Sequence, residues 1–447
     1  MIPWNEIEER YARLFKNRNG NVAKPLRLAL GACIMQAEYG YSDEETALQI
    51  EEAAYLQYFC GYEAYDDSKL PFDPSLMVYF RKRLTPEVLG EINEMILAKA
   101  QKQEPPKDKQ AEINDGKADD NHNDKPEPPA NGGTMIVDAT CAPSQIKYPQ
   151  DASLLNQARE STEKLIDVLH TPGETKPRTY RKKAHKDYLT LVRCRKPSTK
   201  KIRKAIVKQL SYLRRNLSSI HSQLANGKQL TPAEQSRLSV VQKVYEQQMY
   251  MVETGTHSVP NRIVSLSQPW IRPIVRGKAG KAVEFGAKLD ISVVDGFARL
   301  EYLSFDAYNE AGTLKQTIER YRERTGHYPA RVLADKIYRN RDNLNFCRER
   351  GIRLAGPALG RPKKDERPDR KQNYMDECER VEVERRFSLA KRKCNLGMVT
   401  ARLADTTFHC IAMSIVVLNL RKLTLSLALL RKSFFVWLDK RNFVFVQ

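Results

Sequence analysis

No two of the eight cysteines form a Cys-x-x-Cys pair, and the seven histidines are equally dispersed along the 447 residues. This scatter excludes the common zinc-ribbon spacings and is typical of a protein in a reducing cytoplasm. Any metal ion would therefore be bound by oxygen ligands. Such ligands favour magnesium, or manganese, over zinc.

Long apolar segments are also absent. The longest uncharged apolar stretch, residues 406–420, is too short to span a bilayer, and Arg421 and Lys422 end it. The first nine residues are acidic and have no apolar core, so they do not read as a signal peptide. We expect no membrane segment and a cytoplasmic location.

Acidic residues are too few to balance the basic ones. The chain has 75 Lys and Arg against 55 Asp and Glu, a net charge of +20. Such a surplus implies a polyanionic partner, either nucleic acid or an anionic membrane, and the short apolar stretch argues against the membrane. Residues 176–215 contain 16 Lys or Arg and one acid, Asp187, so this segment alone carries +15.

Residues 1–100 read as a compact all-α domain. Ser42-Asp-Glu-Glu45 forms a capping box, and Asp73 and Thr85 each precede a proline at a first helical position. Several short helices joined by tight turns suit a helix-turn-helix-like DNA binder. They suit a plain helical bundle equally well.

Residues 101–133 have Ile113 as their only large apolar side chain. They cannot bury enough surface to fold, so we expect a disordered linker. The α/β domain is expected over residues 134–430. An apolar tail, residues 431–447, follows it, and the sequence suggests no role for this tail.

A basic insertion is expected at about residues 155–260. Its first long helix begins near Lys200 and has apolar residues every three or four positions from Ile202 to Leu224. After a turn, the capping box Thr231–Glu234 starts a return helix, which completes an antiparallel hairpin. A structural or dimerising arm explains this hairpin as well as direct DNA contact does. The basic segment that leads into it is the better DNA candidate.

Residues 283–306 return to β character, because apolar and polar residues alternate on both sides of Asp295-Gly296, a two-residue turn. The elements expected next are a helix near 311–325, a strand at 331–334, a helix near 341–350, a strand at 352–355 and a basic helix. With a short strand at 134–140, this order predicts a mixed α/β fold, a ribonuclease-H-like sheet interrupted once.

Three acids occupy distinctive positions in this order. Asp138 ends the apolar run 135–137, Asp335 ends the run 332–334, and Glu384 lies on the basic helix. Neighbouring strands lie about 4.8 Å apart, so the two aspartates and the glutamate can converge on a pair of divalent ions. Two ions about 4 Å apart can activate an attacking oxygen and stabilise a leaving oxygen at a phosphodiester.

Alternatives exist for each acid. Arg380, Glu384 and Lys391 share nearly one helix face, but Arg380 and Glu384 could form only a surface ion pair. A strand-end aspartate is often a turn or cap residue. The comparable acids are Asp151, Asp290, Asp295 and Glu382, of which Asp295 is better explained by its turn.

Three residues separate Arg380 from Glu384, and six separate Glu384 from Lys391. In these gaps, and in segments 137–140 and 333–338, the chain resembles insertion-sequence transposases of the DDE type, specifically the insertion-sequence-4/5-like group. Residues 71–83 and 276–288 are also similar to that group. The family's tyrosine ahead of the arginine is not matched, because Glu377 occupies its place and Tyr374 is the nearest tyrosine.

The resemblance implies a bacterial, nucleoid-associated transposase. It would bind the terminal inverted repeats of its element, hydrolyse a strand at each end and join the freed 3′ hydroxyl to target DNA. Asp138, Asp335 and Glu384 would hold two magnesium ions, with manganese possible, while Arg380 and Lys391 would contact phosphates. Because two DNA ends are handled together, a homodimer is expected in the DNA complex.

We expect further DNA contacts in the basic segment, from Arg181, Lys182, Lys183, Lys186, Lys200, Lys201, Arg203 and Lys204. The sequence leaves two alternatives open. One is a ribonuclease-H-like nuclease that cuts without strand transfer, and the other is a DNA-binding relative with an inactive catalytic centre.

Overall fold

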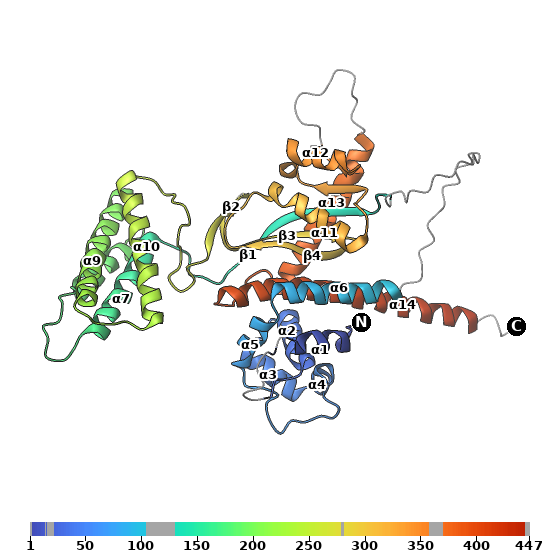
Figure 1. Ribbon diagram of the computed structural model, residues 1–447, viewed down its shortest axis with the longest axis horizontal. Helices are drawn as coiled ribbons and strands as arrows, with labels where there is room; N and C mark the ends of the chain where they lie inside the picture. The colour runs from blue at the N-terminus through green and yellow to red at the C-terminus, as the bar shows by residue number, and fades with distance from the viewer. Residues whose placement is uncertain are drawn as a thin grey trace, which may run out of the picture.

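The computed structural model describes residues 2–13, 15, 22–103, 130–278, 281–356 and 370–442, and the side chains of these residues outside 102–103, 276–282 and 427–442. Figure 1 shows a central sheet with helices on both faces, a group of short N-terminal helices, and a helical bundle to one side of the sheet. The mixed α/β class expected from the sequence is confirmed.

One mixed sheet organises the described part of the chain. Its strands are β1 (Thr134–Pro143), β2 (Arg272–Lys278), β3 (Lys281–Val294), β4 (Phe297–Ser304), β5 (Arg331–Ala334) and β6 (Arg353–Leu354). The order is β2-β3-β1-β5-β6, and β4 pairs with β3. Strand β1 is antiparallel to β3 and parallel to β5, which is parallel to β6.

The β3–β4 hairpin forms as the sequence predicts. Asp295 and Gly296 take positive φ angles of 52° and 73°, as a two-residue turn of this kind requires. Strand β1 is longer than expected and continues to Pro143, because β3 pairs with it as far as Gly286. Asp138 therefore lies inside a strand instead of at its end.

Alternate residues of β1 and β5 face two different cores. Met135, Val137 and Val332 pack with α11 (Leu314–Thr325) and α12 (Arg341–Glu349). Ile136 and Leu333 belong to a larger core with α13 (Arg370–Lys393) and α14 (Ala404–Asn442). Since the period is two, both faces of these strands are covered.

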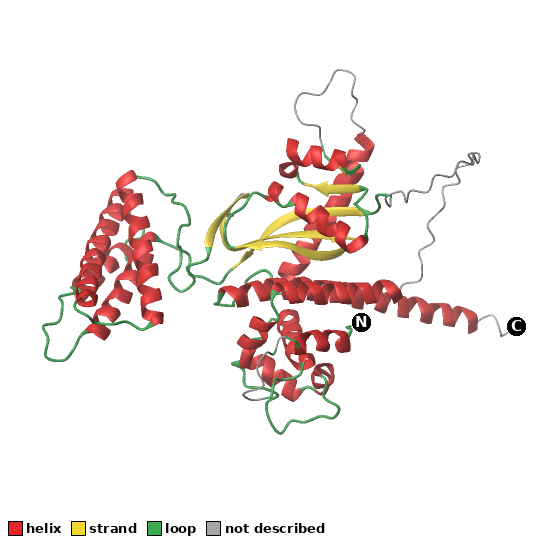
Figure 2. Ribbon diagram, in the orientation of Figure 1, coloured by secondary structure: helices red, strands yellow, loops and turns green. Residues whose placement is uncertain are grey.

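The N-terminal helices are α1 (Trp4–Ala12), α2 (Leu26–Tyr39), α3 (Asp43–Glu52), α4 (Ala54–Cys60), α5 (Leu76–Arg83) and α6 (Pro86–Gln103). The expected capping box joins Ser42 and Glu45 at the start of α3. These helices share one apolar core with α14 and one face of the sheet. Figure 2 shows α6 and α14 running side by side between the short helices and the sheet.

Helix α14 is longer than the apolar stretch seen in the sequence. Its Ala404–Ser426 portion is the one helix in the described chain with the length and composition to cross a membrane, and 61% of its most apolar window is buried in the fold. Arg421 and Lys422 do not end it. Arg421 pairs with Glu38, and Lys422 lies 3.9 Å from the centre of the Phe297 ring. Packing against the protein buries much of this Ala404–Ser426 portion.

The insertion is a bundle, not only a hairpin. Helices α9 (Thr199–Ala225) and α10 (Pro232–Thr254) form the expected pair, with the predicted capping box at Thr231 and Glu234. Helix α7 (Asp151–Leu169) packs along α9, and α8 (Arg181–Val192) packs beside them. The bundle has its own apolar core.

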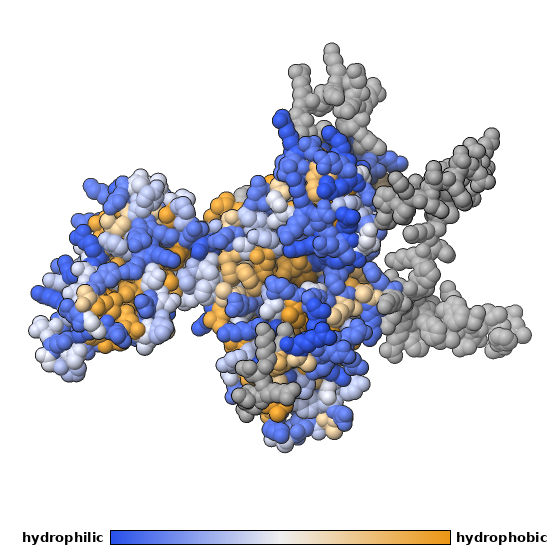
Figure 3. All heavy atoms as spheres, in the orientation of Figure 1, coloured by the Kyte–Doolittle hydropathy of each residue, from blue (hydrophilic) through white to orange (hydrophobic). Residues whose placement is uncertain are grey.

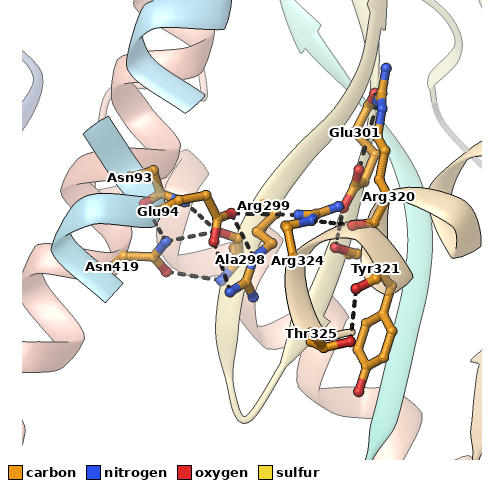
Figure 4. A network of polar contacts seen from close by, with 11 residues as sticks. Asn93, Glu94, Ala298, Arg299, Glu301, Arg320, Tyr321, Arg324, Thr325 and Asn419 are labelled. Carbon is orange, nitrogen blue, oxygen red and sulfur yellow. Dashed lines mark hydrogen bonds and ion pairs between the residues drawn. The ribbon is translucent and has the colours of Figure 1, made fainter. Parts of the chain in front are cut away.

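A polar network fastens α6 and α14 to the edge strand β4 (Figure 4). The Asn419 amide accepts a hydrogen bond from the Ala298 N–H (2.9 Å) and donates to the Ala298 carbonyl (2.7 Å) and to Asn93 (2.9 Å). Beside it, Arg299 and Arg324 contact Glu94, and Arg324 also contacts the buried Glu301 at 2.6 Å.

Replacing Asn419 with Ala should destabilise the protein by about 1–3 kcal/mol, because it leaves the buried Ala298 amide without a partner. The midpoint of thermal unfolding measures the effect. Asn226→Ala, at an exposed position of the bundle, is the matched control and should leave the midpoint nearly unchanged. Equal midpoints for the two variants would show that this network does not hold the helices to the sheet.

Candidate active site

The pairing of β1 with β5 brings Asp138 and Asp335 to neighbouring positions. Val137 pairs with Ala334 in the last step of the parallel register, so the two aspartates come next on their two chains. Asp138 is half-buried, and its carboxylate accepts a hydrogen bond from the Ala139 amide at 2.8 Å. Asp335 is exposed and caps a short 3-10 helix, η2 (Lys336–Tyr338).

The electrostatic surroundings of Asp138 are mainly negative. Burial, the largest cause, and the charges of Glu310 and Asp335 together raise the pKa of its carboxyl group to about 6, against the lowering effects of the Ala139 amide and Arg380. A raised pKa means that the charged form of the carboxylate is disfavoured. A cation near Asp138 would therefore be favourable.

Glu310 lies near this pair, although the sequence alone gives no reason to single it out. It begins the 3-10 helix η1 (Glu310–Gly312) in the connection after β4, and Lys288 contacts its carboxylate at 2.8 Å. A single glutamate between a hairpin and a helix carries no recognisable pattern. Only the tertiary structure could have identified it.

Glu384 is on α13, which packs on the sheet through Val383, Phe387 and Ala390. Its side chain is 58% exposed, and its carboxylate lies 3.8 Å from the guanidinium of Arg380. The surface ion pair considered from the sequence is thus present. Since Arg380 also acts on the pKa of Asp138, this arginine connects the helix electrostatically to the aspartates.

The competing acids have structural partners. Asp151 pairs with Arg262 at 2.6 Å, and Glu382 pairs with Arg386 at 2.5 Å. Asp295 makes the hairpin turn. Asp290 is fully buried beneath two hydroxyl donors, those of Tyr308 and Thr313, each at 2.5 Å.

Two carboxylates at one sheet edge fit a magnesium ion, which usually takes one or two from the protein and completes its shell with water and phosphate oxygens. A second observation agrees. The Tyr338 hydroxyl is fully buried and, in the described part of the chain, has no hydrogen-bond partner. Burial raises its pKa most, and the charges of Asp290, Glu310, Asp138 and Asp335 also raise it. However, no three Asp, Glu, His or Cys side chains among the described residues form a ready-made metal site.

The basic segment lies on α8 and the first turns of α9. Of the residues expected to contact DNA, Arg181 is held within the bundle by Asp167 at 2.5 Å, and Arg203 donates to the Val252 carbonyl at 3.0 Å. Figure 3 shows hydrophilic residues over much of the visible face of the bundle. The exposed members of the set are Lys182, Lys183, Lys186, Lys200, Lys201, Arg203 and Lys204.

Two family models match this chain. Residues 332–421 match a model described as "Transposase DDE domain", and residues 1–83 match one described as "Transposase domain (DUF772)". The first match includes Asp335, Glu384 and Lys391 but does not reach Asp138.

Among curated proteins, the chain is similar to the uncharacterized protein ORF8 in the nfe locus of Rhizobium meliloti, with 33% identity over 92 residues. The match covers 21% of this chain and 44% of that protein, less than half of its length. No solved structure matches.

Asp138→Asn should stabilise the protein in metal-free buffer at pH 8 by up to about 3 kcal/mol. The folded-state pKa of about 6 lies above the ordinary 3.8, so stability is lost as the pH rises through this interval. Asparagine avoids that loss, and its advantage should shrink towards pH 4. Thermal unfolding between pH 4 and pH 8 tests this, with the exposed Asp342→Asn as control. An advantage independent of pH would contradict the assignment.

Proposed function

We propose that this chain, which belongs to the insertion-sequence DDE transposases, cleaves the ends of its insertion sequence and joins their 3′ hydroxyls to target DNA. Placement in the insertion-sequence-4/5-like group is part of the proposal. The observation that carries it is the neighbouring position of Asp138 and Asp335 on parallel strands, beside a helix whose Arg380 acts on Asp138.

A ribonuclease-H-like catalytic domain is likewise proposed. Its support is a sheet in which β4, β3, β1, β5 and β6 follow one another and β3 runs antiparallel to the other four strands. In this proposal the catalytic domain covers residues 134–430 and contains the bundle as an insertion. The N-terminal helices form a separate DNA-binding domain by function, although they share a core with α14.

Asp138, Asp335 and Glu384 would hold the metal ions at the carboxyl edge of the parallel strands. Two bound magnesium ions, or manganese in their place, would supply activation of the attacking oxygen and stabilisation of the leaving oxygen. Arg380 and Lys391 would orient the phosphates, for which the planar guanidinium of arginine is well suited. Glu384 would exchange its contact with Arg380 for the metal, which leaves the guanidinium available to DNA.

In this proposal, DNA cleavage and DNA binding are carried out by different parts of the protein. The excess positive charge lies mainly in residues 176–215, on α8 and α9, outside the strands that carry the aspartates. This bundle and the N-terminal helices would bind the inverted repeats. Since two ends are processed together, a homodimer would form on DNA, and such a protein would work in the cytoplasm at the bacterial nucleoid.

Asp138→Asn, Asp335→Asn and Glu384→Gln should each lower strand cleavage more than about 100-fold with Mg²⁺, because each removes a metal-binding charge worth several kcal/mol. The assay uses a supercoiled plasmid that carries both element ends, with target DNA present. Glu382→Gln, on the same helix but paired with Arg386, should remain active. Unchanged cleavage in Asp138→Asn would refute the metal site, and cutting without joined products would favour the nuclease.

Replacing Lys182, Lys183 and Lys186 with Gln should weaken DNA binding and flatten the dependence of log affinity on log salt by about 2 to 3. These lysines are exposed on α8 and would each neutralise one phosphate. Fluorescence anisotropy over a salt series measures the slope. The exposed Arg237→Gln and Lys243→Gln on α10 serve as control, and an equal loss in both sets would exclude a specific role for the basic segment.

A further inference from the structure

Glu310 emerges at the same edge of the sheet as the two aspartates. Strand β4 is antiparallel to β3, and β3 is antiparallel to β1, so β4 runs in the direction of β1 and β5. The connection after β4, which carries Glu310, therefore leaves the sheet where Asp335 follows β5.

Side-chain contacts fix this connection beside η2. The Asn343 amide donates hydrogen bonds to the carbonyls of Ala311 and Tyr338, both at 2.8 Å, and so joins the residue after Glu310 to the helix that Asp335 caps. Lys288 donates to the Tyr308 carbonyl at 2.9 Å and contacts Glu310 at 2.8 Å. The Glu310 side chain is only 20% exposed.

The Tyr338 hydroxyl indicates that Glu310 and the two aspartates bind a ligand. Its ring is completely buried, and the charges that act on the hydroxyl come from Asp290, Glu310, Asp138 and Asp335. Within the described residues the hydroxyl has no hydrogen-bond partner, although an unpaired buried donor costs about 1–3 kcal/mol. A buried donor among carboxylates that already have other partners is best satisfied by a ligand or a water that those carboxylates bind.

We propose that Glu310 is an additional carboxylate of the divalent-cation site, which accepts a hydrogen bond from a water of the ion bound by Asp138 and Asp335. The Tyr338 hydroxyl contacts the same water shell. Glu310 acts through water because it does not form a ready-made ligand set with the aspartates. Magnesium keeps several waters, and residues that orient the ligand shell commonly change metal affinity 10- to 100-fold. This inference rests on the proposed metal-dependent function.

Binding of Mn²⁺ to the full-length protein without DNA, measured by electron paramagnetic resonance, tests the proposal without relying on activity. Glu310→Gln should weaken Mn²⁺ binding about 10- to 100-fold. Asp342→Asn is the matched control, because Asp342 is also an acid paired with a lysine, Lys315, at 2.7 Å, and should bind Mn²⁺ as the native protein does.

Tyr338→Phe is the second variant, and it removes only the hydroxyl. It should weaken Mn²⁺ binding severalfold without lowering the unfolding midpoint, because the hydroxyl makes no hydrogen bond within the described protein. If the two side chains had only a structural role, both variants would bind Mn²⁺ with native affinity, and Tyr338→Phe would lower the unfolding midpoint.

Asp138→Asn distinguishes a failure of the proposed role of Glu310 from a failure of the proposed function. If it abolishes Mn²⁺ binding while Glu310→Gln and Tyr338→Phe bind normally, the role of Glu310 is refuted and the proposed function stands. If Asp138→Asn binds Mn²⁺ as tightly as the native protein, both are refuted.

Discussion

The parallel pairing of β1 with β5 is the interaction on which the candidate site depends. Val137 and Ala334 are the last paired residues of the two strands, and Asp138 and Asp335 each come next on their own strand, side by side. Both strands are covered on two faces, so their register is fixed by the cores that they separate. A shift by one residue would turn Asp138 to the opposite face and separate it from α13. The packing of this sheet therefore determines the geometry of the acids.

That geometry lowers the stability of the folded protein at the site, because it buries a carboxylate near other carboxylates. Carboxylates gather at one edge of a chain whose net charge is +20, and burial raises the pKa of Asp138 to about 6. The protein is therefore less stable where its function needs negative charge, and a bound divalent cation would stabilise the charged carboxylates. Most of the net positive charge lies elsewhere, in residues 176–215, which include α8 and the first part of α9. Opposite charges needed for metal and for DNA thus avoid neutralising each other.

Features set by local sequence could be predicted. The β3–β4 hairpin follows from Asp295-Gly296, and both capping boxes form where their residues indicate. Features set by distant contacts could not be predicted. Strand β1 extends to Pro143 because β3 pairs with it. Helix α14 continues past Arg421, which forms an ion pair with Glu38. Glu310 reaches the site only through the topology of β4, which leaves no local pattern. The assignment of Asp138, Asp335 and Glu384 as the catalytic set stays a prediction.

The central claim is that Asp138 and Asp335 share a divalent ion. Crystals of the full-length protein with an element end and Mn²⁺, measured near the manganese absorption edge, would locate the ion by anomalous scattering. The account predicts a peak within about 2–2.5 Å of oxygens from both aspartates. Manganese bound elsewhere, with both carboxylates free of it at saturating concentration, would contradict the account.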